Sequence, residues 1–202
     1  MVYNFNLFLT SNESMTSLKS SRLILSLIAL LALSGCGSSD NTQTQLDVFT
    51  QITPSERSFT IDDFKSANFK ISHEYDVEGL IGAVSASNGF WKSSGSVAKE
   101  YEIRFYASHA DAVELGTSLA IEASGETALL DEEDATWDVG LKDRRAFFAG
   151  GVGTHGSGTV QAMYGGYAIY GNMVMLCEGA NQDQALEHCA LLMTIVDPQV
   201  VE

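Results

Sequence analysis

An eleven-residue, largely apolar run near the N-terminus, residues 23–33, decides which part of this chain can contribute to a folded core. The run is shorter than the ~20 residues that an α-helix needs to cross a bilayer, which makes a permanent transmembrane helix the weaker interpretation. The run is apolar on every face and is followed at once by Gly35, Gly37 and a polar stretch, which disfavours a buried core helix. The fold must therefore be sought after it.

The residues on either side of this run have the order found in an export signal. From Met15, the basic residues Lys19 and Arg22 precede the apolar run, which is the layout of a secretory signal peptide. The last residue of the run, Leu33, begins "LSGC", residues 33–36, which resembles the lipobox of bacterial lipoprotein precursors: an aliphatic residue and two small residues before an essential cysteine. The resemblance implies that Cys36 carries a diacylglyceryl group and becomes the first residue after cleavage.

The same resemblance implies how and where the protein is held. Each buried methylene contributes ~0.8 kcal/mol, so two or three acyl chains form a durable anchor without a spanning helix. Gly37 stands where an aspartate would imply retention at the inner membrane, so an outer-membrane location is expected if the organism has two membranes. Residues 1–14 contain no basic residue. We therefore expect residues 1–35 to be the signal peptide, with Met15 as the true start or residues 1–14 as a genuine extension.

Beyond the signal, the composition of the chain changes again. Residues 36–58 are rich in Ser, Thr, Gln and Asp and show no clear hydrophobic period, so we interpret them as the lipidated cysteine and a flexible tether. Residues 59–202 are predicted to form a single domain. The formal net charge of −15 argues against nucleic-acid partners, because such proteins need a basic surface.

Strand and helix patterns alternate within residues 59–202 and predict an α+β fold. Residues 79–92 and 99–108 are β-rich runs that flank the turn 93–96, and residues 146–151 and 158–179 show further strands broken by glycine turns. Helices are expected after three capping residues, Thr60, Ser108 and Asn181. We expect a mainly antiparallel sheet with two or three helices packed on one face. Each half follows the order strand, strand, helix, which suggests a pseudo-repeat.

The three cysteines divide into one lipid-attachment site and one pair. With Cys36 assigned to the anchor, Cys177 and Cys189 are left in the domain. Cys177 ends a predicted strand and Cys189 lies on the apolar face of the last predicted helix, so a disulfide would fasten helix to sheet. Two buried free cysteines are the alternative, and a redox role is disfavoured because the spacing is not Cys-x-x-Cys.

Three further motifs suggest chemistry but lack its context. Residues 151–156, "GVGTHG", match G-x-G-x-x-G, yet a β-type run follows where a dinucleotide site needs a helix, which favours a glycine-rich loop. Residues 131–138, "DEEDATWD", could surround Ca²⁺ but lack the EF-hand spacing, which favours a solvated acidic loop. The histidines have no metal-ligand spacing: His73, His109, His155 and His188. We expect neither a metal nor a cofactor.

The sequence favours binding over catalysis. No G-x-S-x-G, Ser-x-x-Lys or close carboxylate pair in a recognisable setting gives support to hydrolase chemistry, so we expect a binding or interaction module for a small molecule or an envelope protein. Three aromatic residues, Trp91, Tyr106 and Tyr164, could line a ligand groove on the sheet, although core packing is the favoured role. The alternatives are a metal-dependent hydrolase that uses His73, Glu74 or His155, and a structural accessory protein of the envelope.

The lipid anchor is tested by mass spectrometry of the native protein. We expect a chain that begins at Cys36 with the mass of a diacylglyceryl group, and a Cys36→Ser variant that is neither acylated nor cleaved before residue 36. An unmodified chain that begins at Met1 would contradict the lipoprotein interpretation.

Overall fold

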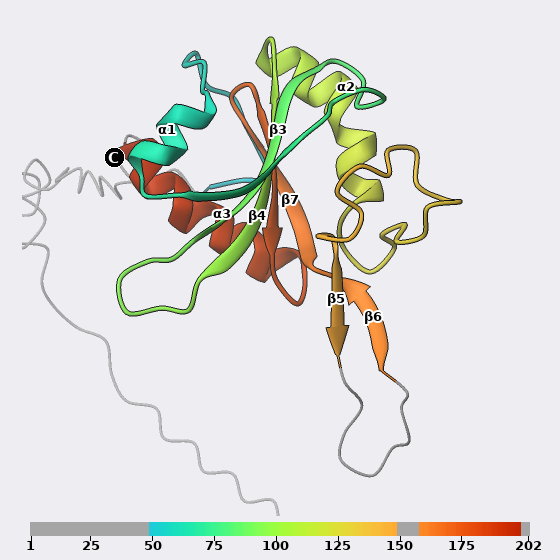
Figure 1. Ribbon diagram of the computed structural model, residues 1–202. Coiled ribbons are helices and arrows are strands. Elements are labelled where there is room, and N and C mark those ends of the chain that lie inside the picture. Colours follow the sequence, from blue (N-terminus) through green and yellow to red (C-terminus); the bar gives the residue numbers. More distant parts are fainter. Residues whose placement is uncertain (1–48, 149–157, 199–202) are drawn as a thin grey trace, which may run out of the picture. The chain divides into compact units, whose positions relative to one another are not determined.

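The computed structural model describes residues 49–148 and 158–198, which form a six-stranded sheet, a separate two-stranded hairpin and three helices (Figure 1). The sheet has the order β1-β7-β8-β4-β3-β2, and every neighbouring pair is antiparallel except β1 with β7. The strands are β1 (Ile52–Thr53), β2 (Lys70–Tyr75), β3 (Ala83–Trp91), β4 (Lys99–Tyr106), β7 (Tyr164–Tyr170) and β8 (Met173–Glu178). The predicted α+β class is confirmed.

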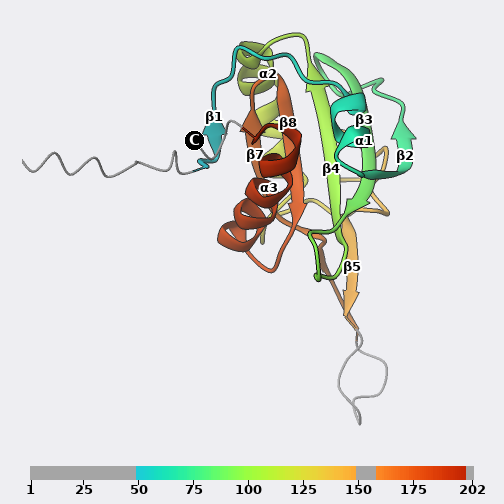
Figure 2. The same cartoon turned by 90° about the vertical axis from the view of Figure 1, so that its left-hand side faces the viewer.

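The helices cover both faces of the sheet, which corrects the expectation that they share one face. Helices α1 (Ile61–Ser66) and α3 (Gln182–Val196) pack on one face, and α2 (His109–Glu122) packs on the other (Figure 2). The reason lies in the central strands, which are apolar on both sides. In β8, Met175 and Cys177 face α3, while Val174 and Leu176 face α2. Both faces must be covered to remove these side chains from water.

The predicted helix starts are confirmed by their capping contacts. The Asp63 carboxylate accepts a hydrogen bond from the Thr60 N–H at 2.8 Å before α1. Ser108 accepts from the Asp111 N–H at 3.1 Å before α2, and Asn181 accepts from the Gln184 N–H at 3.0 Å before α3. Each contact satisfies a backbone N–H that has no partner within its helix, so local sequence determines where the helices begin.

The described strands also follow the expected pseudo-repeat in order. Strands β3 and β4 precede α2, and β7 and β8 precede α3, with β4 and β8 adjacent at the centre of the sheet. Strands β1 and β2 were not predicted, because β1 has only two residues and β2 is mostly exposed at the edge. The hairpin of β5 (Arg145–Phe148) and β6 (Thr159–Ala162) flanks the glycine-rich run 151–156, which lies outside the described residues.

The folded domain begins before residue 59, which corrects the predicted extent of the tether. The Ile169 N–H donates to the Gln51 carbonyl at 2.7 Å, so β1 adds to the edge of β7. The Phe49 ring stacks on Tyr170 with 6.0 Å between ring centroids, and the Arg57 guanidinium pairs with Asp63. Gln51 and Phe49 have these partners in the distant C-terminal half, so no local period in the sequence indicated them.

The disulfide between Cys177 and Cys189 is present and confirms the predicted pairing. It joins the end of β8 to α3, and both cysteines lie in the core between the sheet and that helix. The chain between them spans 12 positions, a loop for which the entropy lost by the unfolded chain corresponds to roughly 3 kcal/mol. Among the described residues, no helix is both long and apolar enough to cross a membrane.

Removal of the disulfide should destabilise the domain without changing its fold. We expect a Cys177→Ala, Cys189→Ala double variant to lose about 3 kcal/mol in the free energy of unfolding, measured by denaturant titration under oxidising conditions. A Ser94→Ala variant, at an exposed position, is the control and should unfold like the unsubstituted chain. Equal stability of the double variant and the control would contradict the structural role of the bridge.

Candidate functional site

A buried ionic cluster lies between the sheet and the long connection that follows α2. Glu102 and Arg104 belong to β4 and Arg144 precedes β5, and all three side chains are buried. Glu102 Oε1 accepts from Arg104 Nε at 2.7 Å and from Arg144 Nη2 at 3.1 Å, and Glu102 Oε2 accepts from Arg144 Nε at 2.9 Å. One carboxylate therefore holds two guanidinium groups.

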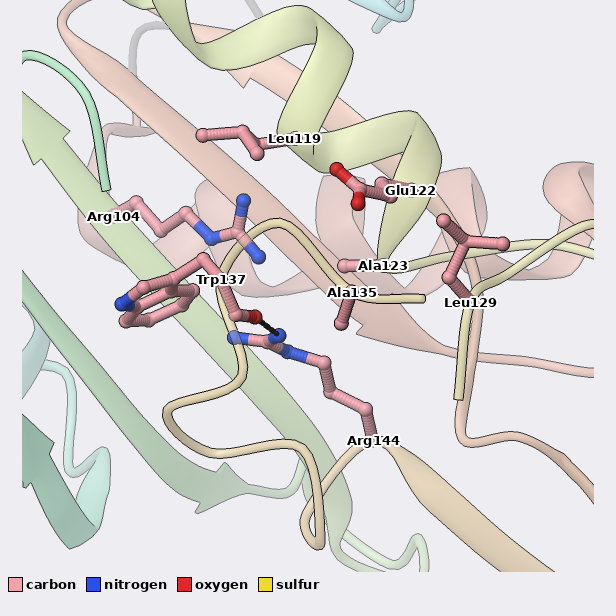
Figure 3. A pocket seen from close by; sticks show the side chains of 8 residues that line it. All are labelled: Arg104, Leu119, Glu122, Ala123, Leu129, Ala135, Trp137 and Arg144. Carbon is pink, nitrogen blue, oxygen red and sulfur yellow. Dashed lines mark hydrogen bonds between the residues drawn. The ribbon is translucent and has the colours of Figure 1, made fainter. Parts of the chain in front are cut away.

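Arg144 also holds the connection itself against the sheet. Its Nη1 donates to the Trp137 carbonyl at 2.9 Å (Figure 3). Its Nη2 donates to the Val139 carbonyl at 2.8 Å. The Trp137 ring packs against both guanidinium groups, with centroid distances of 4.4 Å to Arg144 and 5.1 Å to Arg104. These contacts add cation–π attraction to the hydrogen bonds. They give a long connection without regular structure a fixed position.

The two arginines keep the buried Glu102 carboxyl ionised. Burial alone would raise its pKa, but the charges and hydrogen bonds of Arg104 and Arg144 outweigh burial and hold the pKa below the usual range. The folded state therefore gains stability from this carboxylate above the pKa of an unfolded glutamic acid. That stability is lost as the pH falls through the lower pKa of the folded state.

A cavity next to Arg104 is too small for an organic ligand. Its volume is about 10 Å³, the space of one water molecule, and its wall includes Arg104, Glu122 and Trp137 (Figure 3). Arg104 Nη1 and Nη2 have no hydrogen-bond partner within the part of the chain that the structure describes. The cluster is therefore a structural anchor, and a ligand site must be sought elsewhere.

A much larger groove lies where the connection, the β5–β6 hairpin and the start of α3 meet. Its volume is about 1120 Å³. We call it the edge groove, and it is lined by Gly125, Glu126, Thr127, Leu130, Ala146, Val160, Gln161, Ala162, Met163, Gly165, Glu178, Gly179, Ala180, Asn181, Gln182 and Gln184. Its charged lining residues are two glutamates, and its other side chains are amides, one hydroxyl and small or aliphatic groups. The groove can therefore offer hydrogen bonds and negative charge.

The ionic cluster and the edge groove are linked through two successive arginines. Arg144 enters the cluster, whereas Arg145 Nε donates to the Leu130 carbonyl at 2.5 Å in the groove wall. The Arg144 carbonyl accepts from the Met163 N–H at 2.8 Å, which fixes the end of β6. The position of the groove walls thus depends on the buried charges.

Two glycines allow the groove floor to form. A Cβ at Gly165 would lie 2.4 Å from the Gly179 carbonyl oxygen, and one at Gly179 would lie 2.7 Å from the Ala185 nitrogen. Both distances are shorter than a van der Waals contact permits, so the segment that leads into α3 approaches β7 closely only because side chains are absent. The sequence predicted turns at these glycines, and it did not indicate that Gly165 and Gly179 allow this close packing.

The aromatic residues named from the sequence do not form a ligand groove. Trp91, Tyr106 and Tyr164 are all buried, and they lie on opposite sides of the sheet: Trp91 with α1 and α3, the two tyrosines with α2. Trp91 Nε1 donates to the Ala67 carbonyl at 3.0 Å, and the Tyr164 hydroxyl accepts from Asn88 Nδ2 at 3.0 Å. These contacts are those of core residues, which is the role that the sequence favoured for all three side chains.

The residues named for a hydrolase are not arranged as a catalytic relay. His73 Nδ1 lies 3.1 Å from Ser72 Oγ and 3.7 Å from Asp143 Oδ2, so both neighbours approach the same ring nitrogen. A relay needs the nucleophile and the carboxylate on opposite nitrogens. Glu74 is exposed, and His155 lies outside the described residues.

The acidic loop is exposed to solvent, whereas His109 and His188 contact backbone carbonyls. In residues 131–138 the charged side chains are exposed and only Trp137 is buried. His109 Nδ1 lies 2.7 Å from the Gly171 carbonyl oxygen, and His188 Nδ1 lies 2.5 Å from that of Glu178. Within residues 49–148 and 158–198, no group of His, Cys, Asp and Glu side chains is placed to hold a metal ion.

Comparison with known proteins identifies a family but no activity. Residues 60–198, most of the chain, match the model of a family described as "Family of unknown function (DUF6810)". No curated protein and no solved structure matches the chain.

Neutralisation of Glu102 should leave two buried arginines without their counter-charge. We expect Glu102→Gln to lower the free energy of unfolding by about 3–5 kcal/mol at pH 7. The two proteins should become more similar in their free energy of unfolding as the pH falls through the lowered pKa of Glu102, because protonation then neutralises the Glu102 carboxyl of the unsubstituted chain. Denaturant titrations from pH 7 to pH 3 measure both effects. Glu132→Gln, at an exposed position, is the control. If Glu102→Gln lowers the free energy of unfolding no more than this control does, the anchoring role of Glu102 is refuted.

Proposed function

We propose that this chain, which belongs to the DUF6810 family, is a lipid-anchored extracytoplasmic binding module that holds its ligand in the edge groove. The observation that carries the proposal is the groove itself. Its volume of about 1120 Å³ is large enough to hold a ligand, and its lining combines apolar surface with a few polar groups, as binding sites do. The ligand would therefore be held mainly by shape and hydrogen bonds.

The anchor follows from the order of basic residues, apolar run and lipobox before Cys36. A net charge of −15 repels anionic lipid surfaces, so attachment to a membrane requires such an anchor. We place the domain outside the cytoplasm, at the outer membrane of an organism with two membranes. The disulfide between Cys177 and Cys189 supports an oxidising compartment.

The two rival functions have less support from the described residues. A hydrolase would need a nucleophile, a base and an orienting group in one cleft, whereas the edge groove contains two carboxylates, of which Glu178 pairs with Lys99 at 2.7 Å. A purely structural accessory protein would need an exposed apolar patch but no groove. The exposed Phe147 and Val160 beside the edge groove are consistent with a protein partner, which is a form of binding.

Hydrogen–deuterium exchange tests the binding role on the complete lipoprotein. We expect slower exchange of backbone amides at residues 125–130 and 159–163 in native membranes than in the purified protein, because a bound ligand shields them. Amides of α1, none of whose residues line the groove, serve as the internal control and should exchange equally in both samples. Equal exchange at the groove in membranes and after purification would contradict the proposal.

A further inference from the structure

We infer that the edge groove binds an extended, basic polypeptide segment, which adds to the β5–β6 hairpin as a third strand beside β6. This inference rests on the proposed function, because it names the class of ligand for the same groove. Its first support is the register of the hairpin.

The register shows which backbone groups of β6 are free. The Met163 N–H donates to the Arg144 carbonyl at 2.8 Å, one position beyond the registered pair Arg145 and Ala162, so this bond occupies a hydrogen-bonded position of the ladder. Bonded and non-bonded pairs alternate along an antiparallel ladder. Val160 and Ala162, opposite Phe147 and Arg145, are therefore in non-bonded positions. Their N–H and C=O groups point away from β5, toward the open side of β6.

The neighbouring positions along the same edge already have partners. The Tyr164 carbonyl accepts from the Gly125 N–H at 2.9 Å, the Tyr167 carbonyl accepts from Gln182 Nε2 at 3.2 Å, and the Ile169 N–H donates to Gln51. The outward groups of Val160 and Ala162 have no partner among the described residues. Both residues line the edge groove, so the free groups and the available space coincide.

Such an edge is a template for another strand. An extended peptide that pairs with Val160 and Ala162 would form main-chain hydrogen bonds of the kind used in β-strand addition. Val160 is 52% exposed, and its cross-strand neighbour Phe147 is 70% exposed. A third strand beside Val160 would cover part of this apolar pair, which favours β-branched or aliphatic residues at the matching positions of the partner.

The negative charge of the groove favours basic residues at the remaining positions of the bound peptide. The groove is lined by Glu126 and Glu178 and by no lysine or arginine. Leu130 in the groove wall leads directly into the acidic loop of residues 131–134, whose four side chains are exposed carboxylates. Arg145 is the cation found near this loop, 3.7 Å from Asp131. Glu178 is already paired with Lys99, so the partner's lysine or arginine residues would pair with Glu126 and the acidic loop, and an acidic partner would be repelled.

A matched pair of synthetic peptides tests this inference on the full-length lipoprotein in detergent. The probe is a capped, fluorescently labelled octapeptide of alternating valine and lysine, and the comparison peptide has glutamate in place of lysine. Fluorescence anisotropy should show at least tenfold tighter binding of the lysine peptide at low salt, and the difference should shrink as salt screens the charges. A lysine peptide N-methylated at alternate residues loses main-chain donors and should bind at least tenfold more weakly.

Variants of the protein locate the contact. Ala162→Pro removes the outward N–H but no donor to β5, and should weaken binding of the lysine peptide about tenfold. Glu126→Gln should weaken it several-fold, while Glu114→Gln, at an exposed position of α2, is the charge control and should not. The N-methylated peptide gives the same information if the proline variant does not fold.

The outcomes separate this inference from the proposed function. Equal binding of the lysine and glutamate peptides, full binding of the N-methylated peptide, or no binding of the lysine peptide would each overturn the inference. If the groove amides are nevertheless protected in native membranes, the proposed function stands and the ligand belongs to another class. If they are not protected there either, both proposals fail.

Discussion

The fold around the edge groove depends on one buried carboxylate, Glu102, that neutralises two guanidinium groups. An ion removed from water needs a close counter-charge and hydrogen bonds, and Glu102 receives both from Arg104 and Arg144. Because Arg144 also binds the carbonyls of Trp137 and Val139, the charge pairing extends to the backbone of the long connection. The same residue fixes Met163, so the hairpin and the groove are placed by the cluster.

The face of the sheet that α3 covers is stabilised by apolar packing and a disulfide and not by the buried ionic cluster. There α3 packs through an apolar stripe, and the bridge between Cys177 and Cys189 fastens it to β8. This division leaves the start of α3 in a fixed position beside β7, where Gly165 and Gly179 permit close approach. One wall of the groove therefore depends on the disulfide-linked face, and the other depends on the buried charges.

Sequence reasoning succeeded where the interactions are local. The capping residues Thr60, Ser108 and Asn181 mark the helix starts, and parity together with helical spacing indicated the disulfide. It failed where partners are distant. The alternation of β4 placed Glu102 and Arg104 on one face, but the burial of that face depends on α2 and on the connection around Arg144, which lie later in the chain. Likewise, the edge groove arises from backbone groups at Val160 and Ala162, whose side chains carry no signal of a binding edge.

The central claim, that Arg144 fixes the connection to the sheet, is tested most directly by the fluorescence of Trp137. In a Trp91→Phe background, Trp137 is the sole tryptophan, because the chain has two. We expect its emission to shift to longer wavelength in an added Arg144→Met substitution, while far-ultraviolet circular dichroism shows that the sheet and helices persist. An emission maximum unchanged by Arg144→Met would show that the connection holds its place without the buried charges, and would contradict the account.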